Sequence, residues 1–102
     1  MIRRFVISVD AEMPDEQARI TDYFKVQGLQ YWHWLQHQWL VVDYQDKWNV
    51  ISLRNALNKL APTRNNFVIQ IKEDWNWMAM HVPKEAIDWI NEHWSKEVHE
   101  ET

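Results

Sequence analysis

The chain has no cysteine, only one glycine and only three prolines among its 102 residues. The missing cysteines exclude disulfide bonds, thiolate metal ligands and a thiol nucleophile, and they suit a reducing cytoplasm. A single glycine, Gly28, excludes a glycine-rich phosphate-binding loop. With so few turn-forming residues we expect short connections within one cytoplasmic domain.

Long apolar runs are missing as well. No stretch approaches the roughly 18 residues of a membrane span, and no apolar core of a signal peptide follows the first arginines. The net charge of −4 disfavours general nucleic-acid binding, in which lysine and arginine neutralise phosphates. A local basic patch is the alternative, and its candidates are dispersed along the sequence: Arg3, Arg4, Arg54, Lys59 and Arg64.

Apolar residues recur with the period of a strand in four segments and with the period of a helix in three. The predicted strands are residues 3–10, 29–35, 38–44 and 66–72. The first helix is expected to begin at Pro14 and to end at Gly28, and Asp46 or Asn49 can cap the second, which spans residues 50–60. Pro83 opens a last helix with Ile87, Ile90 and Trp94 on one side.

The order strand, helix, strand, strand, helix, strand predicts an α+β ferredoxin-like fold, βαββαβ. In this fold two helices cover one face of a four-stranded antiparallel sheet. We assign residues 3–80 to the ferredoxin-like domain and residues 81–102 to a C-terminal helical extension of the same domain. The second face of the sheet then needs a cover from this extension or from another chain.

The central hairpin is unusually aromatic. Residues 28–44, GLQYWHWLQHQWLVVDY, contain three tryptophans, two tyrosines and two histidines. A sheet with one wet face alternates apolar and polar residues, whereas this hairpin has large apolar side chains on both faces. Regular alternation places Tyr31, His33 and Leu35 on one face and Trp32 and Trp34 on the other.

Two explanations fit this aromatic surface. Either residues 75–80, WNWMAM, fold back over the sheet and the aromatics form an ordinary core, or a homodimer forms through the sheet face or through a swapped C-terminal strand, which we favour. Glu73 and Asp74 beside the last aromatic pair favour a protein partner over a nucleic acid. The candidate interface residues are Trp32, His33, Trp34, Trp39, Trp75 and Trp77.

The hairpin also resembles a known family. Residues 28–35, GLQYWHWL, followed by residues 38–42, QWLVV, are similar to the aromatic-Trp-His-aromatic-Leu … Trp-Leu/Ile-Val hairpin of SinR-like proteins. These are small relatives of the CRISPR-associated protein 2 family. The resemblance covers roughly residues 3–80 and implies a ferredoxin-like homodimer.

In the CRISPR-associated relatives, the acidic residue that ends the first strand lies near the dimer axis. There it has been taken as a ligand of Mg²⁺ or Mn²⁺ in an endoribonuclease or endodeoxyribonuclease, while other members are non-catalytic scaffolds for duplex DNA. Asp10 is the residue that matches this position, and Glu12 or Asp15 could assist it. A plain alternative is that Asp10 caps the turn after the strand.

The sequence favours binding over catalysis. A magnesium site commonly uses one or two carboxylates with water and substrate phosphate, and Asp10 is the only residue that the resemblance supplies for it. His33 and His37 do not have the spacing of a metal site when they lie on a strand and a turn. We therefore expect a non-catalytic homodimer that binds a protein and needs no cofactor. A metal-dependent nuclease and a nucleic-acid scaffold are the alternatives.

Overall fold

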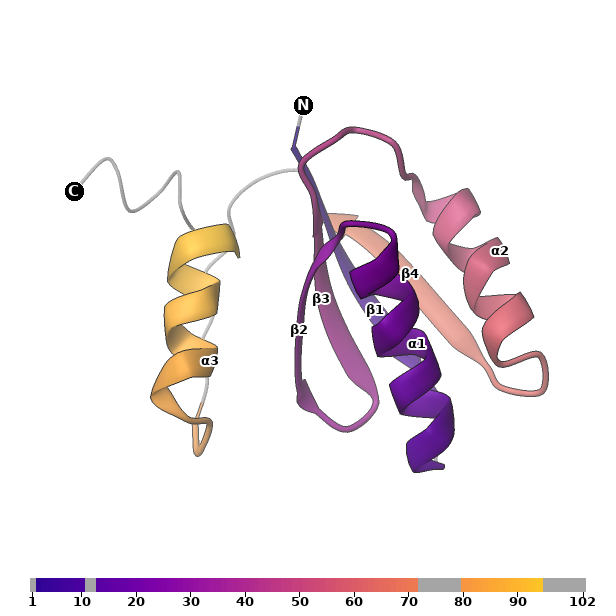
Figure 1. The fold of residues 1–102 in the computed structure, drawn as a ribbon, viewed down its shortest axis with the longest axis horizontal. Helices are drawn as coiled ribbons and strands as arrows, with labels where there is room; N and C mark the ends of the chain where they lie inside the picture. Colours follow the sequence, from indigo (N-terminus) through magenta and orange to yellow (C-terminus); the bar gives the residue numbers. More distant parts are fainter. Residues whose placement is uncertain (1, 11–12, 72–79, 95–102) are drawn as a thin grey trace.

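The computed structural model describes residues 2–10, 13–71 and 80–94. Each element lies close to its predicted bounds, and Figure 1 shows their arrangement. The elements are β1 (Arg3–Val9), α1 (Pro14–Val26), β2 (Gln30–Leu35), β3 (Gln38–Asp43), α2 (Val50–Leu60), β4 (Asn66–Ile71) and α3 (Lys84–Trp89), which continues as a π-helical turn (Ile90–Trp94).

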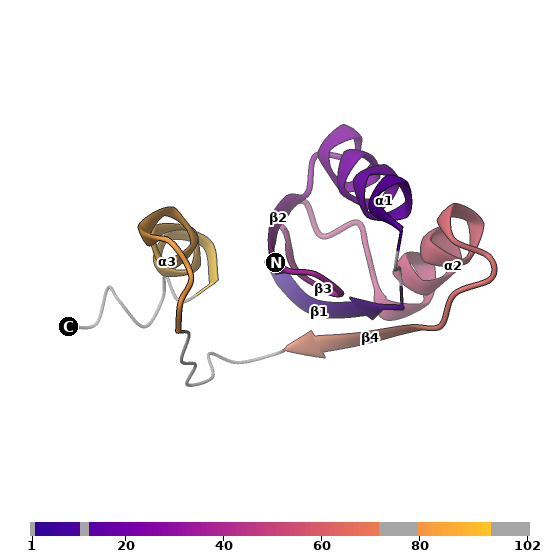
Figure 2. The same cartoon turned by 90° about the horizontal axis from the view of Figure 1, so that it is seen from below.

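The four strands form one antiparallel sheet in the order β2-β3-β1-β4. Helices α1 and α2 cover one face of it, which we call the inner face (Figure 2). This order and layering confirm the predicted ferredoxin-like fold. Because β1 and β3 occupy the centre, β2 and β4 are the two edge strands.

Local signals at the helix ends agree with the prediction. Gly28 follows α1 with a φ of 76°, a left-handed conformation that glycine adopts without a Cβ clash. At the start of α2, the Asn49 side chain accepts a 2.8 Å hydrogen bond from the Ser52 amide, and the Ser52 hydroxyl accepts one from the Asn49 amide. Of the two predicted caps Asn49 is therefore the one used, and Asp46 instead forms an ion pair with Arg3.

The inner face holds the larger core. Alternate residues of β1 and β3 meet the apolar stripes of α1 and α2 there, as their periods predict. Trp39 is fully buried in this layer, and its indole N–H donates a 3.0 Å hydrogen bond to the Thr21 hydroxyl. The buried members are Phe5, Ile7, Val9, Ile20, Phe24, Leu29, Trp39, Val41, Leu53 and Leu57.

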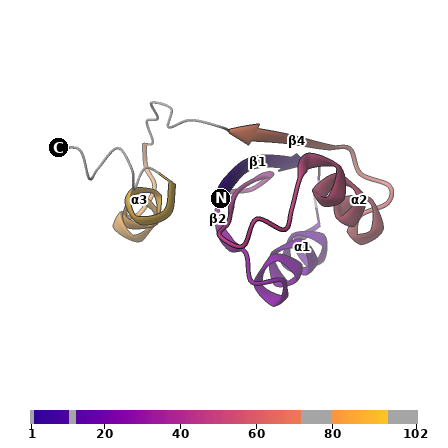
Figure 3. The ribbon, with the colours of Figure 1, turned by 90° about the horizontal axis from the view of Figure 1, so that it is seen from above.

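The other face, the outer face, is covered by α3 and its π-helical turn. In Figures 2 and 3 this helix lies on the β2 side of the sheet. Its buried residues pack against the sheet in a second, smaller core of Trp32, Val42, Ala86, Ile90 and Trp94. The C-terminal extension therefore covers part of its own sheet.

Three polar contacts fix this outer helix. The buried Trp32 indole donates a 3.1 Å hydrogen bond to the Ala86 carbonyl. The Arg4 guanidinium donates to the His93 carbonyl, and the Tyr44 hydroxyl lies 2.7 Å from the His93 Nδ1 atom. Strand β2 thus holds the first turn of α3, while β1 and the residue that follows β3 hold the last described turn of the chain.

A buried carboxylate shapes the connection from β3 to α2. Asp43 is 2% exposed, and its two oxygens accept hydrogen bonds of 2.7–2.9 Å from the backbone amides of Gln45, Lys47 and Trp48. Such bonds offset the cost of burying a charged group. They leave Trp48 half-buried and edge-on to Tyr23, with ring centroids 6.1 Å apart.

Candidate functional site

The predicted interface tryptophans of the hairpin have different positions. Trp39 lies in the inner core and Trp32, 5% exposed, lies beneath α3, so both pack within the subunit. Trp34 is 45% exposed. Trp75 and Trp77 lie outside the residues that the structure describes. In the described part of the chain, Trp34 is therefore the candidate tryptophan that a partner can reach.

An irregularity in β2 changes which side chains share a face. Trp32 pairs with Leu40, but Leu35 pairs with Gln38, so β2 carries one extra residue between these pairs. Because side chains alternate along a strand, a shift of one residue moves the later side chains to the opposite face. Leu35 consequently lies on the outer face with Gln38, and its expected place beside Tyr31 is wrong.

The outer face exposes apolar side chains where α3 does not cover it. The strand register aligns Leu35, Gln38, Ser8 and Phe67 in one row and Trp32, Leu40, Val6 and Ile69 in the next. Exposure rises along the second row from Trp32 beneath α3 to Ile69 on β4, and Phe67 is 61% exposed. We call the exposed and half-buried apolar members the outer-face patch: Val6, Leu35, Leu40, Phe67 and Ile69.

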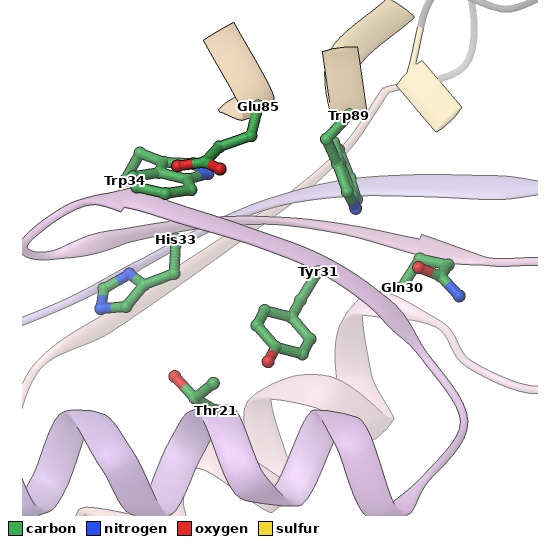
Figure 4. Close-up of a pocket in the computed structure, with 7 residues that line it drawn as sticks. All are labelled: Thr21, Gln30, Tyr31, His33, Trp34, Glu85 and Trp89. Atoms are coloured by element: carbon green, nitrogen blue, oxygen red, sulfur yellow. The ribbon is translucent and has the colours of Figure 1, made fainter. Parts of the chain in front are cut away.

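A groove of about 450 Å³ follows the outer edge of β2 (Figure 4). On the side of α1 it is lined by Thr21, Tyr31 and His33. On the side of α3 it is lined by Trp34, Glu85 and Trp89, and Gln30 lies toward the beginning of β2. We call it the β2 groove. It combines aromatic walls with one carboxylate.

His33 is a fixed, neutral wall of the β2 groove. Its ring stacks on Trp39 with centroids 4.0 Å apart and planes within 4°. Its Nδ1 atom lies 3.0 Å from the Gln38 carbonyl oxygen, which can only accept, so Nδ1 carries the proton. Burial lowers the pKa of His33 below its ordinary value of 6.5 and outweighs the raising effect of the Gln38 carbonyl. The imidazole is therefore uncharged at neutral pH.

Asp10 lies at a second hollow, of about 360 Å³, at the end of β1. The Asp10 amide donates to the Asn65 carbonyl, and the preceding Val9 amide donates to the His37 carbonyl, each at 2.9 Å. These bonds gather the end of β1, the hairpin turn and the start of β4. The lining residues are Ser8, Val9, Asp10, His37, Asn65, Asn66 and Phe67.

Among the described residues, the lining of this hollow carries a single carboxylate, Asp10, and one imidazole, beside the neutral side chains of Ser8, Asn65 and Asn66. Mg²⁺ sites usually combine one or two carboxylates with other oxygen ligands in octahedral geometry. Among the residues that the structure describes, no three acidic, histidine or cysteine side chains form a group that could hold a metal. The predicted assistant Asp15 is exposed on α1, and Glu12 lies outside the described residues.

The predicted basic candidates do not combine into a phosphate-binding surface. Arg3 pairs with Asp46 at 2.6 Å and Arg64 pairs with Glu16 at 2.9 Å. Arg4 is 9% exposed and donates to the end of the outer helix. Arg54 and Lys59 are left as exposed residues on α2. The positive charges therefore serve mainly contacts within the subunit.

The ion pair between Glu16 and Arg64 also sets the charge state of the carboxylate. Hydrogen bonding from the Arg64 guanidinium is the main effect that lowers the pKa of Glu16 below its ordinary value of 4.5. The same carboxylate accepts a bond from the Met13 amide at the start of α1. The pair joins the beginning of α1 to the segment after α2, and it lies away from the β2 groove.

The chain was compared with known families, with curated proteins and with solved structures, and none of them matches it. In the described part of the chain, no helix is both long and apolar enough to span a membrane. The similarity of the hairpin to SinR-like proteins therefore remains a prediction from sequence.

Proposed function

We propose that the protein is a homodimeric, non-catalytic module that works by binding other proteins. The observation that carries this proposal is the outer-face patch, an apolar surface left uncovered beside the outer helix. Phe67, Leu35 and Ile69 are each more than 40% exposed on it. Contiguous exposed apolar surface of this kind marks interaction sites on soluble proteins.

A second copy of the chain is the proposed occupant, because the outer-face patch lacks the charges that oppose association elsewhere on the surface. The net charge of −4 makes two copies repel over most of their surface. The outer-face patch has no ionisable member, so two patches meet without desolvating a charge. A twofold dimer places the same patch on both sides.

The size of the patch limits the expected affinity. Each partner of a stable complex contributes about 800 Å², and five partly exposed side chains provide less than that. We therefore expect a dimer that dissociates at micromolar concentration and not an obligate one.

The test measures mass against concentration by sedimentation. The double variant Phe67→Ser, Ile69→Ser should raise the dimer dissociation constant at least about tenfold, because each serine removes apolar surface from the interface. The matched control is the double variant Val26→Ser, Ile51→Ser, which removes exposed apolar residues from α1 and α2. A wild-type chain that stays monomeric at several hundred micromolar concentration contradicts the proposal.

A metal-dependent nuclease is the second candidate, because the Asp10 hollow adjoins the patch. Ser8 and Phe67 line the hollow and lie in the outermost row of the outer face. A dimer through the patch would thus bring two copies of Asp10 toward each other, as the resemblance implies. This candidate predicts Mg²⁺- or Mn²⁺-dependent cleavage of RNA or DNA that Asp10→Asn abolishes and that Asp22→Asn, at an exposed position on α1, preserves. Absence of cleavage with either metal counts against it.

Nucleic-acid scaffolding is the weaker alternative, and it is tested by salt. Binding through phosphates weakens steeply as salt rises, so duplex DNA should bind at low salt and dissociate at physiological salt. Binding that is absent or independent of salt excludes the scaffold. The resemblance would place either kind of binding protein in a CRISPR-related or phage–host setting.

A further inference from the structure

The outer edge of β2 is open to another strand. In the described residues, β2 pairs only with β3, so the backbone amides and carbonyls that point away from β3 meet no strand. Unpaired edges of this kind are ready templates for an extended segment of another chain. Regular pairing with β3 holds from Gln30 to Trp32, before the extra residue. We therefore consider this short run as the pairing surface.

The β2 groove gives this edge two walls. Thr21 on α1 stands on one side of the strand, and Glu85 and Trp89 on α3 stand on the other (Figure 4). The bulge presents Trp34 on the α3 side of the strand, where it lines the groove together with Glu85 (Figure 4). A strand that pairs with β2 would thus have its side chains next to these residues.

The lining of the groove selects for a positive charge. Glu85 is exposed, and among the described lining residues it is the one that is charged at neutral pH, since His33 is neutral. Indole rings attract cations through their faces, and arginine also stacks on them. A carboxylate beside two tryptophans therefore suits the guanidinium or ammonium group of an incoming side chain.

In the described part of the chain, the edge strands of a second copy do not supply that group. The described edge strands read QYWHWL in β2 and NFVIQI in β4, and neither contains lysine or arginine. Arg3 and Arg4 lie on β1 in the centre of the sheet. Charge complementarity thus favours a segment of a different protein.

We propose that the β2 groove binds an extended, basic segment of a partner protein as a fifth strand of the sheet. Its backbone pairs with Gln30–Trp32, and one of its arginine or lysine side chains lies against Trp34, Trp89 and Glu85. The groove shares no residue with the outer-face patch. The proposal for the groove and the proposal of a dimer through the patch can therefore be contradicted independently.

The first test measures the binding of synthetic peptides to the full chain by fluorescence anisotropy. The probe is a blocked heptapeptide of alternating threonine and valine with arginine at its centre, and its matched forms carry glutamine or glutamate there. We expect the arginine form to bind about tenfold more tightly than the glutamine form, since glutamine forms neither the cation–π contact nor the ion pair. The glutamate form should bind still more weakly.

Variants of the protein locate the site. Glu85→Gln and Trp34→Ala should each remove most of the preference for arginine. Both residues are exposed, so folding is retained and circular dichroism checks it. The matched controls are Glu92→Gln, an exposed carboxylate on the π-helical turn outside the groove, and Ile51→Ala, an exposed apolar residue on α2. Both controls should bind as the wild type does.

A backbone probe separates strand addition from side-chain capture. N-methylation of the peptide residues whose N–H groups point toward β2 should abolish binding. N-methylation of the alternate residues, whose N–H groups point away from β2, should preserve it. Hydrogen exchange at Gln30–Trp32 should slow in the complex. The proposal is overturned if the arginine, glutamine and glutamate peptides bind equally, or if neither groove variant changes binding. It is also overturned if the two methylated forms bind equally, or if no peptide binds at millimolar concentration. Peptide-induced dimers that Trp34→Ala abolishes would assign the groove to a second copy instead.

Discussion

The two faces of the sheet carry similarly apolar residues but are covered to different extents. Two helices, each connecting two strands, close the inner face, and Trp39 at its centre is fully buried. A single helix that follows the last strand covers the outer face over β2 and β3, while Phe67 and Ile69 on β4 are exposed. Apolar residues along one face of a sheet therefore indicate that this face needs a cover. The connections between the strands decide how much of the face is covered.

The largest expected effect is on the inner face. Trp39→Ala should lower the free energy of unfolding by about 3–5 kcal/mol, because it opens a cavity and removes the partner of the His33 ring. Trp34→Ala, at an exposed position of the neighbouring strand, should cost well under 1 kcal/mol. Urea denaturation measures both. Similar losses for the two variants would break the distinction between packing and surface tryptophans.

A matched pair compares the two cores directly. Leu53→Ala on the inner face and Ile90→Ala on the outer face remove similar groups from sites that are 0% and 4% exposed. We expect losses of about 4 and 2 kcal/mol, because a helix packed on one layer can shift to fill a cavity. Denaturation of both proteins under one condition gives the difference. A larger loss for Ile90→Ala would mean that the outer helix is the more rigid cover.

A smaller effect is expected from the bond that fixes the outer helix. Trp32→Phe keeps most of the ring and removes the hydrogen bond to the Ala86 carbonyl, which costs about 1 kcal/mol. Hydrogen exchange should accelerate in α3 and remain unchanged in α2. Trp48→Phe is the control, since that indole belongs to the inner layer. Uniform acceleration would show that both layers open together.

The smallest expected effect is a pH dependence of folding stability, which arises from His33 on the inner side of the β2 groove. Burial lowers the pKa of His33 in the folded chain, whereas the unfolded histidine titrates near 6.5. The unfolded state thus binds more protons over this interval, so stability falls as the pH drops below about 6.5 and through the folded pKa. His33→Phe should flatten this slope in thermal melts between pH 7.5 and 5.5. An unchanged slope would assign it to another group.

The Glu16 carboxylate acts in a lower pH range. Its lowered pKa gives stability that is present above 4.5 and is lost as the pH falls through the folded pKa. Glu16→Gln therefore leaves the slope above pH 5.5 unchanged. It serves as the control that separates the two groups.

The sequence predicted the elements and their order because these follow from local periods and caps. The stripes of α1 and α2, Gly28 and Asn49 all act within a few neighbours. The extra residue in β2 was not predictable, since Trp34 and Leu35 are both large and apolar, so the sequence does not indicate which of them lies on which face. The order of elements in such a fold is therefore easier to predict than the face of the sheet on which each strand side chain lies.

The site was less predictable because its contacts join distant residues. The groove joins Thr21 on α1 and Trp34 on β2 to Glu85 on α3, three elements that are separate in sequence. Asp43 was also missed, although an aspartate directly before a turn, here Tyr-Gln-Asp-Lys, is a known signal for bonds to turn amides. Charge and composition indicated binding, but only the arrangement of strands and helices gives a groove with a stated chemistry.

The attachment of α3 has a consequence for the order of folding during synthesis. The Trp32 and Arg4 contacts to this helix span 54 and 89 residues. Chains emerge from the ribosome N-terminus first, and contacts over long separations form late. A nascent chain that has completed β4 would still present Trp32 and Val42 to water, which makes the hairpin a target for chaperones until the last helix docks.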